Sequence, residues 1–258
     1  MSIITTPDPA TAVVYPESDG KPMADNTRQF RWIVTIQGGF DAIFREKANV
    51  FVAGDLLWYP VEGQPRTRQA PDVMIVFGRP KGERGSYQQW REGNIAPQVV
   101  WEVLSPGNTV NEMTRKFSFY DRHGVEEYYI YDPDRGTLIG YLRIDDHLEK
   151  IDDIEGWISP RTHVTLLLNG GNLIVLRPDG AAFASYLELD YQRADAAIRA
   201  DQERQRADQE RQRADQERQR ADQERQRADQ EYQRADNAEA RAAALAARLR
   251  ELGIDPDA

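Results

Sequence analysis

Residues 97–105 read Pro-Gln-Val-Val-Trp-Glu-Val-Leu-Ser, and residues 71–76 earlier in the chain read Pro-Asp-Val-Met-Ile-Val. Both stretches are rich in branched and aromatic residues and begin at a proline, so each predicts a buried β-strand. Asp72 opens the first strand and Glu102 lies inside the second. An ionised carboxylate in such a strand is costly unless it is paired or binds a metal. These two acids are therefore the first candidates for chemistry.

If the two strands are neighbours in one sheet, both carboxylates can converge on a single cation. Magnesium is typically held by one or two carboxylates, several waters and a substrate phosphate. The alternatives are a structural strand-start aspartate for Asp72 and, for Glu102, a structural glutamate with a buried partner. Without a metal the two acids would repel each other. The metal hypothesis thus predicts that Glu102→Gln leaves the metal-free fold equally or slightly more stable.

A third candidate, Lys116, follows in an amphipathic segment. Apolar residues recur every three to four positions between Asn108 and His123, and Gly124 stops the pattern, which predicts a helix. On helical spacing Lys116 shares the sheet-facing side with Met113 and Tyr120. It could orient an attacking water or neutralise charge on phosphoryl oxygens. The alternative is a lysine whose stem covers the core while its amine stays in solvent.

The surrounding pattern predicts an α/β fold with a central mixed sheet and flanking helices. Asn26 can cap a helix through Phe44, with Gly38 and Gly39 as a weak point. Further strands are expected at Val50–Tyr59, Glu127–Tyr131, Thr137–Ile144, Val164–Leu168 and Leu173–Leu176, the last two joined by a hairpin turn.

From residue 200 the sequence repeats Ala-Asp-Gln-Glu-Arg-Gln-Arg with a strict period of seven. This period predicts a long helix, from about Leu187 to Leu252, with a tendency to supercoil. In five successive repeats glutamate occupies the position three after the alanine, from Glu203 to Glu231, where a coiled coil needs an apolar residue. The seam improves at the C-terminal end with Leu245, Leu249 and Leu252, and Leu189 and Ala196 lie on it at the other end. The segment is therefore either a solvated charged helix or a weak coiled coil, and a homodimer is expected.

Three regions follow: an N-terminal arm at 1–24, an α/β domain at 25–185 and a helical tail at 186–258. The net charge of −10, from 43 acidic and 33 basic residues, provides no general attraction to phosphate. The absence of cysteine excludes disulfides, thiolate zinc sites and iron–sulfur clusters, so any metal must use other ligands. With no signal peptide or long apolar run, the expected location is the cytoplasm, without membrane contact.

Several of these residues together resemble a known family. Asp72, the strand Val100–Pro106, Lys116, Tyr120 and the segment Gly124–Tyr129 followed by Asp132-Pro133 resemble the Uma family of restriction endonucleases. That family belongs to the PD-(D/E)XK nuclease superfamily, and the resemblance spans roughly residues 25 to 180. It implies a restriction-endonuclease-like fold, DNA as the partner and Mg²⁺ as the cofactor, with Mn²⁺ as an alternative.

The resemblance also implies roles for single residues. Asp72 and Glu102 match the two metal-binding acids, and the backbone carbonyl of Val103 matches a further metal ligand. The superfamily lysine normally stands two residues after the glutamate, where this chain has Leu104, so Lys116 matches a lysine that has migrated to the helix. Additional acids are less well placed: Glu46 or Asp41 on the first helix, and Glu17 in a weak N-terminal acidic motif.

The loop Gly78–Gly85 lacks the Gly-Lys-Ser/Thr ending of a nucleotide-binding loop. Arg79, Lys81 and Arg84, followed by aromatic residues, make it a candidate DNA contact, with a solvated loop or lid as the alternative. The leading hypothesis is a metal-dependent endonuclease that hydrolyses DNA phosphodiester bonds with a metal-activated water. The alternative is a catalytically silent nuclease-fold module for binding or assembly that works through its helical tail.

Overall fold

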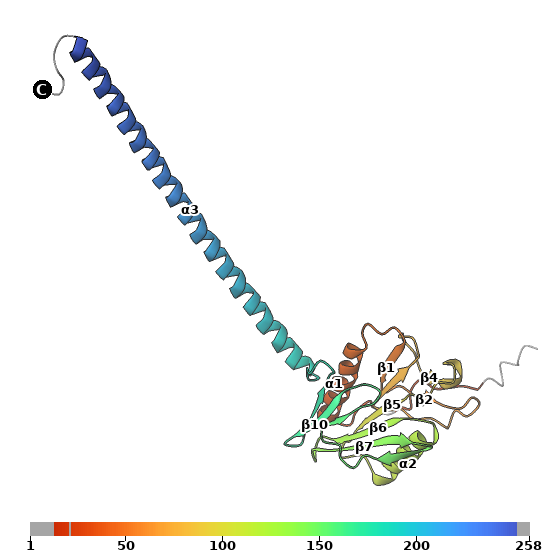
Figure 1. Cartoon of the computed structure of the whole chain (residues 1–258). Coiled ribbons are helices and arrows are strands. Elements are labelled where there is room, and N and C mark those ends of the chain that lie inside the picture. Colours follow the sequence, from red (N-terminus) through yellow and green to blue (C-terminus); the bar gives the residue numbers. More distant parts are fainter. Residues whose placement is uncertain (1–12, 21, 252–258) are drawn as a thin grey trace, which may run out of the picture. The chain divides into compact units, whose positions relative to one another are not determined.

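The computed structural model describes residues 13–20 and 22–251, and the chain divides into two compact units, Met1–Leu189 and Asp190–Ala258 (Figure 1). Most of the predicted N-terminal arm lies outside the described residues. So do Leu252 and the predicted helix stop after it, and the side chain of Leu249 is not described either.

The fold is α/β, with a central mixed sheet, flanking helices and a long C-terminal helix. The sheet has six strands in the order β1, β3, β5, β6, β7, β8, and all neighbours are antiparallel except β5 and β6. The bounds are β1 (Val50–Gly54), β3 (Val73–Phe77), β5 (Val99–Val103), β6 (Glu127–Asp132), β7 (Thr137–Ile144) and β8 (His147–Lys150). The parallel pair is connected through the helix α2 (Val110–Arg122).

Smaller elements complete the first unit. The short strands β2 (Trp58–Tyr59) and β4 (Tyr87–Gln88) pair in parallel, and a 3₁₀ turn, η2 (Gln89–Arg91), follows. A second antiparallel sheet is made by β9 (Trp157–Ile158), β10 (Thr165–Asn169) and β11 (Asn172–Leu176). The helix α1 (Thr27–Ile43) begins at Asn26, whose side chain accepts a hydrogen bond from the backbone N–H of Gln29, as the sequence predicts.

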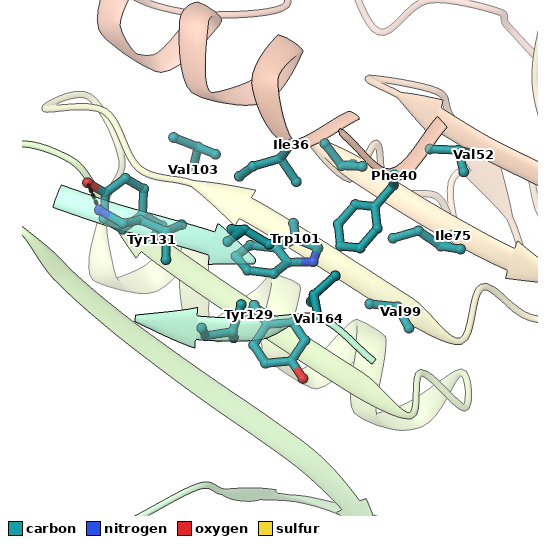
Figure 2. Close-up of a cluster of buried hydrophobic side chains, with 14 of the residues drawn as sticks. Ile36, Phe40, Val52, Ile75, Val99, Trp101, Val103, Tyr129, Tyr131 and Val164 are labelled. Carbon is teal, nitrogen blue, oxygen red and sulfur yellow. Dashed lines mark hydrogen bonds between the residues drawn. The ribbon is translucent and has the colours of Figure 1, made fainter. Parts of the chain in front are cut away.

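The two faces of the central sheet carry different cores. Ile36 and Phe40 of α1 point toward Trp101 of β5, over one face (Figure 2). Val100 packs on the opposite face with Tyr120 of α2. Successive side chains of a strand alternate between the two faces. Glu102 therefore shares the α2 face with Val100.

Gly39 has a structural role inside α1. A Cβ atom at this position would lie 2.2 Å from the ring of Phe183, so only glycine allows this close packing. The predicted weak point does not interrupt the helix, because Phe183 and the sheet hold it in place.

The prediction of one strand over Val50–Tyr59 is wrong. Asp55 has a φ of 48°, in the left-handed region, and this turn separates β1 from β2. The strands β4, β8 and β9 were not predicted from the sequence. They have only two to four residues, and pairing with neighbouring strands holds them extended.

The helix α3 (Tyr186–Glu251) contains 66 residues and includes the heptad repeats. Of its described side chains from Asp190 onward, only Ala246 is partly buried. Arg199 forms an ion pair with Asp195, four residues earlier. At about 1.5 Å per residue, a helix of this length extends about 100 Å. In the described part of the chain, no helix is both long and apolar enough to cross a membrane.

Candidate active site

The two predicted acids lie on one face of the sheet at adjacent strands. β3 and β5 are hydrogen-bonded neighbours, with Val73 opposite Trp101. One step further along this register sets Asp72 opposite Glu102. Both acids belong to the α2 face, because the residues next to them, Val73 and Trp101, pack in the α1 core. The two carboxylates therefore lie on the same face of adjacent strands.

Glu102 is nearly inaccessible, at 2% exposure, and both of its carboxylate oxygens are bonded. The Lys116 ammonium donates to Oε2 at 2.7 Å, and the Tyr120 hydroxyl donates to Oε1 at 2.5 Å. Both donors come from α2, which packs over the strand. Glu102 therefore has the buried partner that a structural glutamate needs, and that partner is Lys116, a predicted catalytic residue.

Asp72 is also buried, but fewer hydrogen bonds offset the burial of its carboxylate than at Glu102. Its Oδ2 accepts the backbone N–H of Val103 at 2.6 Å. Burial, and then the negative charge of Glu102, raise the pKa of Asp72 well above its ordinary value, although Lys116 and the Val103 N–H oppose this. A nearby cation would favour the ionised form, so the environment of Asp72 suits a positively charged ligand.

The ammonium group of Lys116 is attracted by both acids, Glu102 and Asp72. Burial disfavours its ammonium form, but attraction by Glu102, and then by Asp72, outweighs burial and raises the pKa of Lys116 above its ordinary value. The residue is 9% exposed, so the alternative of a lysine with its amine in solvent does not hold. It remains a charged amine at the wall of a cleft.

The cleft beside these residues has a volume of about 650 Å³. Its walls come from the segment before α1, the turn at Asp55, the residues before β3 and the start of α2. Five carboxylates line it, namely Asp19, Asp25, Asp55, Asp72 and Glu112, whereas Lys116 is the one cation among its lining residues. Such a site favours metal cations and disfavours a polyanion that approaches without one.

The predicted backbone ligand, Val103, has another partner. Its carbonyl accepts a hydrogen bond from the Gln29 side chain at 2.8 Å. Gln29 also accepts the backbone N–H of Asp25 at 2.8 Å, so it ties the start of α1 to the end of β5. A carbonyl oxygen has two lone pairs, and this hydrogen bond uses one of them.

The other predicted acids lie elsewhere. Asp41 accepts a hydrogen bond from Gln37 and pairs with Lys81, and Glu46 pairs with Arg45 on the surface. Neither of these acids lines the cleft, and Glu17 does not line it either. The Glu17 carboxylate lies instead so close to Gly85 that a Cβ there would be 2.0 Å from it.

The three predicted DNA contacts each have a carboxylate partner within the protein. Arg84 bonds both oxygens of Glu92, at 2.7 and 3.3 Å, and lies 3.9 Å over the ring of Phe51. Arg79 lies 3.9 Å from Glu92, and Lys81 lies 3.8 Å from Asp41. Arg84 in particular holds its own loop together, so this arrangement does not support the predicted role of the loop.

Among the described residues, no group of three or more His, Cys, Asp or Glu side chains is arranged to hold a metal ion. The candidate donors are two carboxylates on adjacent strands and one carbonyl. Of these residues only Asp72 lines the cleft, whereas Glu102 and Val103 are 2% and 1% exposed. Two carboxylates with retained waters suit magnesium, which seldom occupies an all-protein cage. The donor types fit a magnesium-type ion, and Glu102 would have to give up its hydrogen bond from Lys116 or from Tyr120 to bind it.

A family model described as "Putative restriction endonuclease", Uma2, matches residues 21–166, more than half of the chain. The chain belongs to the Uma2 family. A search of curated proteins finds no match. Among solved structures, a "putative nuclease belonging to DUF820" from Anabaena variabilis is 17% identical, with a TM-score of 0.39 over 56% of this chain and 79% of that chain.

In this Uma2 family member, several groups in and behind the cleft wall were not predicted from the sequence. Tyr120 was expected only to pack on the sheet, yet its hydroxyl donates a hydrogen bond to Glu102. The Ser105 hydroxyl donates to Asp25 at 2.5 Å, which fixes an acid that no motif marks. Asp55 has a raised pKa, chiefly from burial and then from Asp19. The Gly54-Asp55 pair at the end of an apolar run was a turn signal that the sequence offered.

Proposed function

We propose that the protein is a Mg²⁺-dependent endonuclease that hydrolyses phosphodiester bonds of DNA, with Mn²⁺ as an alternative metal. The observation that carries this proposal is the buried group Asp72, Glu102 and Lys116, of which Asp72 and Lys116 line an acid-rich cleft. Burying three charges is costly unless they serve one another or a ligand. Family membership supports the nuclease class, and the geometry supports the assignment of these residues.

Asp72 and Glu102 would hold the metal, with the Val103 carbonyl as a further donor. A bound divalent cation supplies Lewis-acid stabilisation of phosphoryl oxygens and lowers the pKa of a water molecule. Asp72 would bind in its ionised form, since a cation reverses the effects of burial and of Glu102 that raise its pKa. Glu102 would offer the cation an oxygen that Lys116 or Tyr120 now occupies.

Lys116 would neutralise charge on the substrate. Its ammonium has three N–H donors, and one of them is used by Glu102. The others are free to reach a phosphate oxygen or a water molecule in the cleft that Lys116 lines. As a compact point charge it stabilises developing negative charge without a fixed geometry.

Family membership supports DNA as the proposed partner, and we further propose a homodimer formed through α3. The repeats put alanine at one seam position and glutamate at the other, so the apolar area for pairing is small. Leu245 is exposed near the C-terminal end of the helix and provides apolar surface there. Pairing would bring a second nuclease domain without changing the site within each domain.

The test is DNA cleavage by the full chain on supercoiled, linear and single-stranded DNA, with Mg²⁺, with Mn²⁺ and with a chelator. Asp72→Asn, Glu102→Gln and Lys116→Met should each abolish cleavage. The matched controls are Glu149→Gln and Lys150→Met on β8, which are exposed and should cleave as wild type does. Cleavage that persists in the Glu102 and Lys116 variants would refute these roles. A folded wild type that binds metal but cleaves no DNA would support the silent module instead.

A further inference from the structure

The acidic cleft requires positive charge at its edge if DNA is to enter. Five carboxylates line the cleft, and the whole chain carries a net charge of −10. DNA affinity comes largely from cations that neutralise backbone phosphates. Lys116 is a single cation assigned to the scissile phosphate, so other cations must contact the phosphates on either side of it.

The loop Gly78–Gly85 is a poor source of this charge. Arg79 and Arg84 both pair with Glu92, and Lys81 pairs with Asp41. To contact DNA, each cation would first have to lose its carboxylate partner. None of these three residues lines the cleft.

The loop between β2 and β3 has cations without such partners and is continuous with the cleft wall. It carries Arg66 and Arg68, which do not line the cleft themselves, and leads directly into Gln69 and Ala70, which do. Arg68 donates to the Pro65 carbonyl at 3.4 Å. Within residues 13–20 and 22–251, neither arginine has a carboxylate within ion-pair distance.

This loop is also held in place. At its base Trp58 and Gln69 exchange two backbone hydrogen bonds, at 2.8 and 3.2 Å. At its far end the backbone N–H of Gly63 donates to the Tyr15 hydroxyl at 2.6 Å, and the Tyr15 ring packs against Tyr59 and Trp90. Anchoring at both ends restricts the backbone that carries the two arginines next to cleft-lining Gln69 and Ala70, which reduces the entropy lost on binding.

We propose that Arg66 and Arg68 form the phosphate-binding rim of the cleft and that their partner is the backbone of duplex DNA. This inference rests on the proposed nuclease function and names the residues that bring its substrate to the site. The guanidinium fork matches phosphate oxygens in a bidentate geometry and keeps its charge at all relevant pH values. The contact is to the backbone, so it strengthens binding without selecting a sequence.

The test is the salt dependence of binding to a labelled DNA duplex, measured by fluorescence anisotropy on the full chain with a chelator and again with Ca²⁺. The test variant is Arg66→Gln/Arg68→Gln. Its matched control, Arg79→Gln/Lys81→Gln, removes the same charge from the other loop. A third variant, Arg66→Lys/Arg68→Lys, restores the charge. Tryptophan fluorescence melting verifies that all variants fold.

We expect the test variant to bind more weakly and to lose about 2 in the slope of log affinity against log salt, about 1 for each phosphate contact removed. The control should keep the wild-type slope, and the lysine variant should regain most of it. Equal slopes for the test variant and wild type, or an equal loss in the control, would overturn this inference and leave the nuclease proposal standing. Absence of wild-type binding at low salt in both metal conditions would overturn the nuclease proposal as well.

Discussion

Replacing Glu102 by Gln tests how the site is held together without metal. The change keeps the shape of the side chain but removes the charge that faces the Lys116 ammonium at 2.7 Å. The sequence alone predicted equal or greater stability, because it considered only repulsion between Asp72 and Glu102. The structure adds a buried cation, so the variant leaves Lys116 without its closest partner.

The magnitude follows from the burial of the pair. The side chains of Lys116 and Glu102 are 11% and 2% exposed, so solvent screens them little. Removing one partner of a buried ion pair typically costs about 3–5 kcal/mol. Relief of repulsion with Asp72 offsets part of this, which leaves a net loss of about 3 kcal/mol. At about 2–4 °C per kcal/mol for a domain of this size, the melting temperature should fall by about 6–12 °C.

The assay is thermal melting in a chelator, followed by tryptophan fluorescence. All five tryptophans, at 32, 58, 90, 101 and 157, lie in the first unit, so the signal excludes the tail helix. Lys116→Met and the double variant complete a thermodynamic cycle. The double variant should be less destabilised than the sum of the single variants, by roughly 0.5–3 kcal/mol, because neither charge remains unpaired.

Two outcomes would refute this reasoning. If Glu102→Gln melts at or above wild type without metal, the buried pair does not stabilise the fold. If the effects of the single variants simply add in the double variant, Lys116 and Glu102 do not interact. Glu149→Gln, on the exposed edge strand, controls for the chemical change itself and should melt with wild type.

Two further predictions concern Asp72 and the tail. The pKa of Asp72 is raised in the folded state, so its contribution to stability is lost as pH rises above the ordinary aspartate value of about 3.9. Without metal, the Asp72→Asn variant should therefore melt at or above the wild-type temperature at neutral pH, and this difference should vanish in acid. Mg²⁺ should not raise the melting temperature of the variant. A large loss of stability at neutral pH would show that the carboxylate is structural. In sedimentation experiments the full chain should dimerise weakly at micromolar concentration, and Leu245→Ala or Leu249→Ala should weaken the dimer. A tight dimer that is insensitive to both changes would contradict the heptad argument.

Several features of the protein follow from local sequence alone. The apolar strands with one carboxylate each, the amphipathic helix that presents Lys116 and the seven-residue repeat of the tail are all periodic patterns. Periodicity is a property of consecutive residues, so it predicts which face a side chain occupies without a structure. The joint placement of Asp72, Glu102 and Lys116 follows once the two strands are assumed to be neighbours.

The tertiary structure decided the properties that depend on distant residues. The partners of Glu102, the engagement of Val103 by Gln29 and the pairing of Arg79 and Arg84 with Glu92 join segments that the sequence separates. The short strands β4 and β9 and the turn at Asp55 likewise depend on their neighbours in space. The local sequence encodes the charge of a side chain and the face of the helix or strand on which it lies. The pairing of one charge with another depends on contacts that form only when the chain folds.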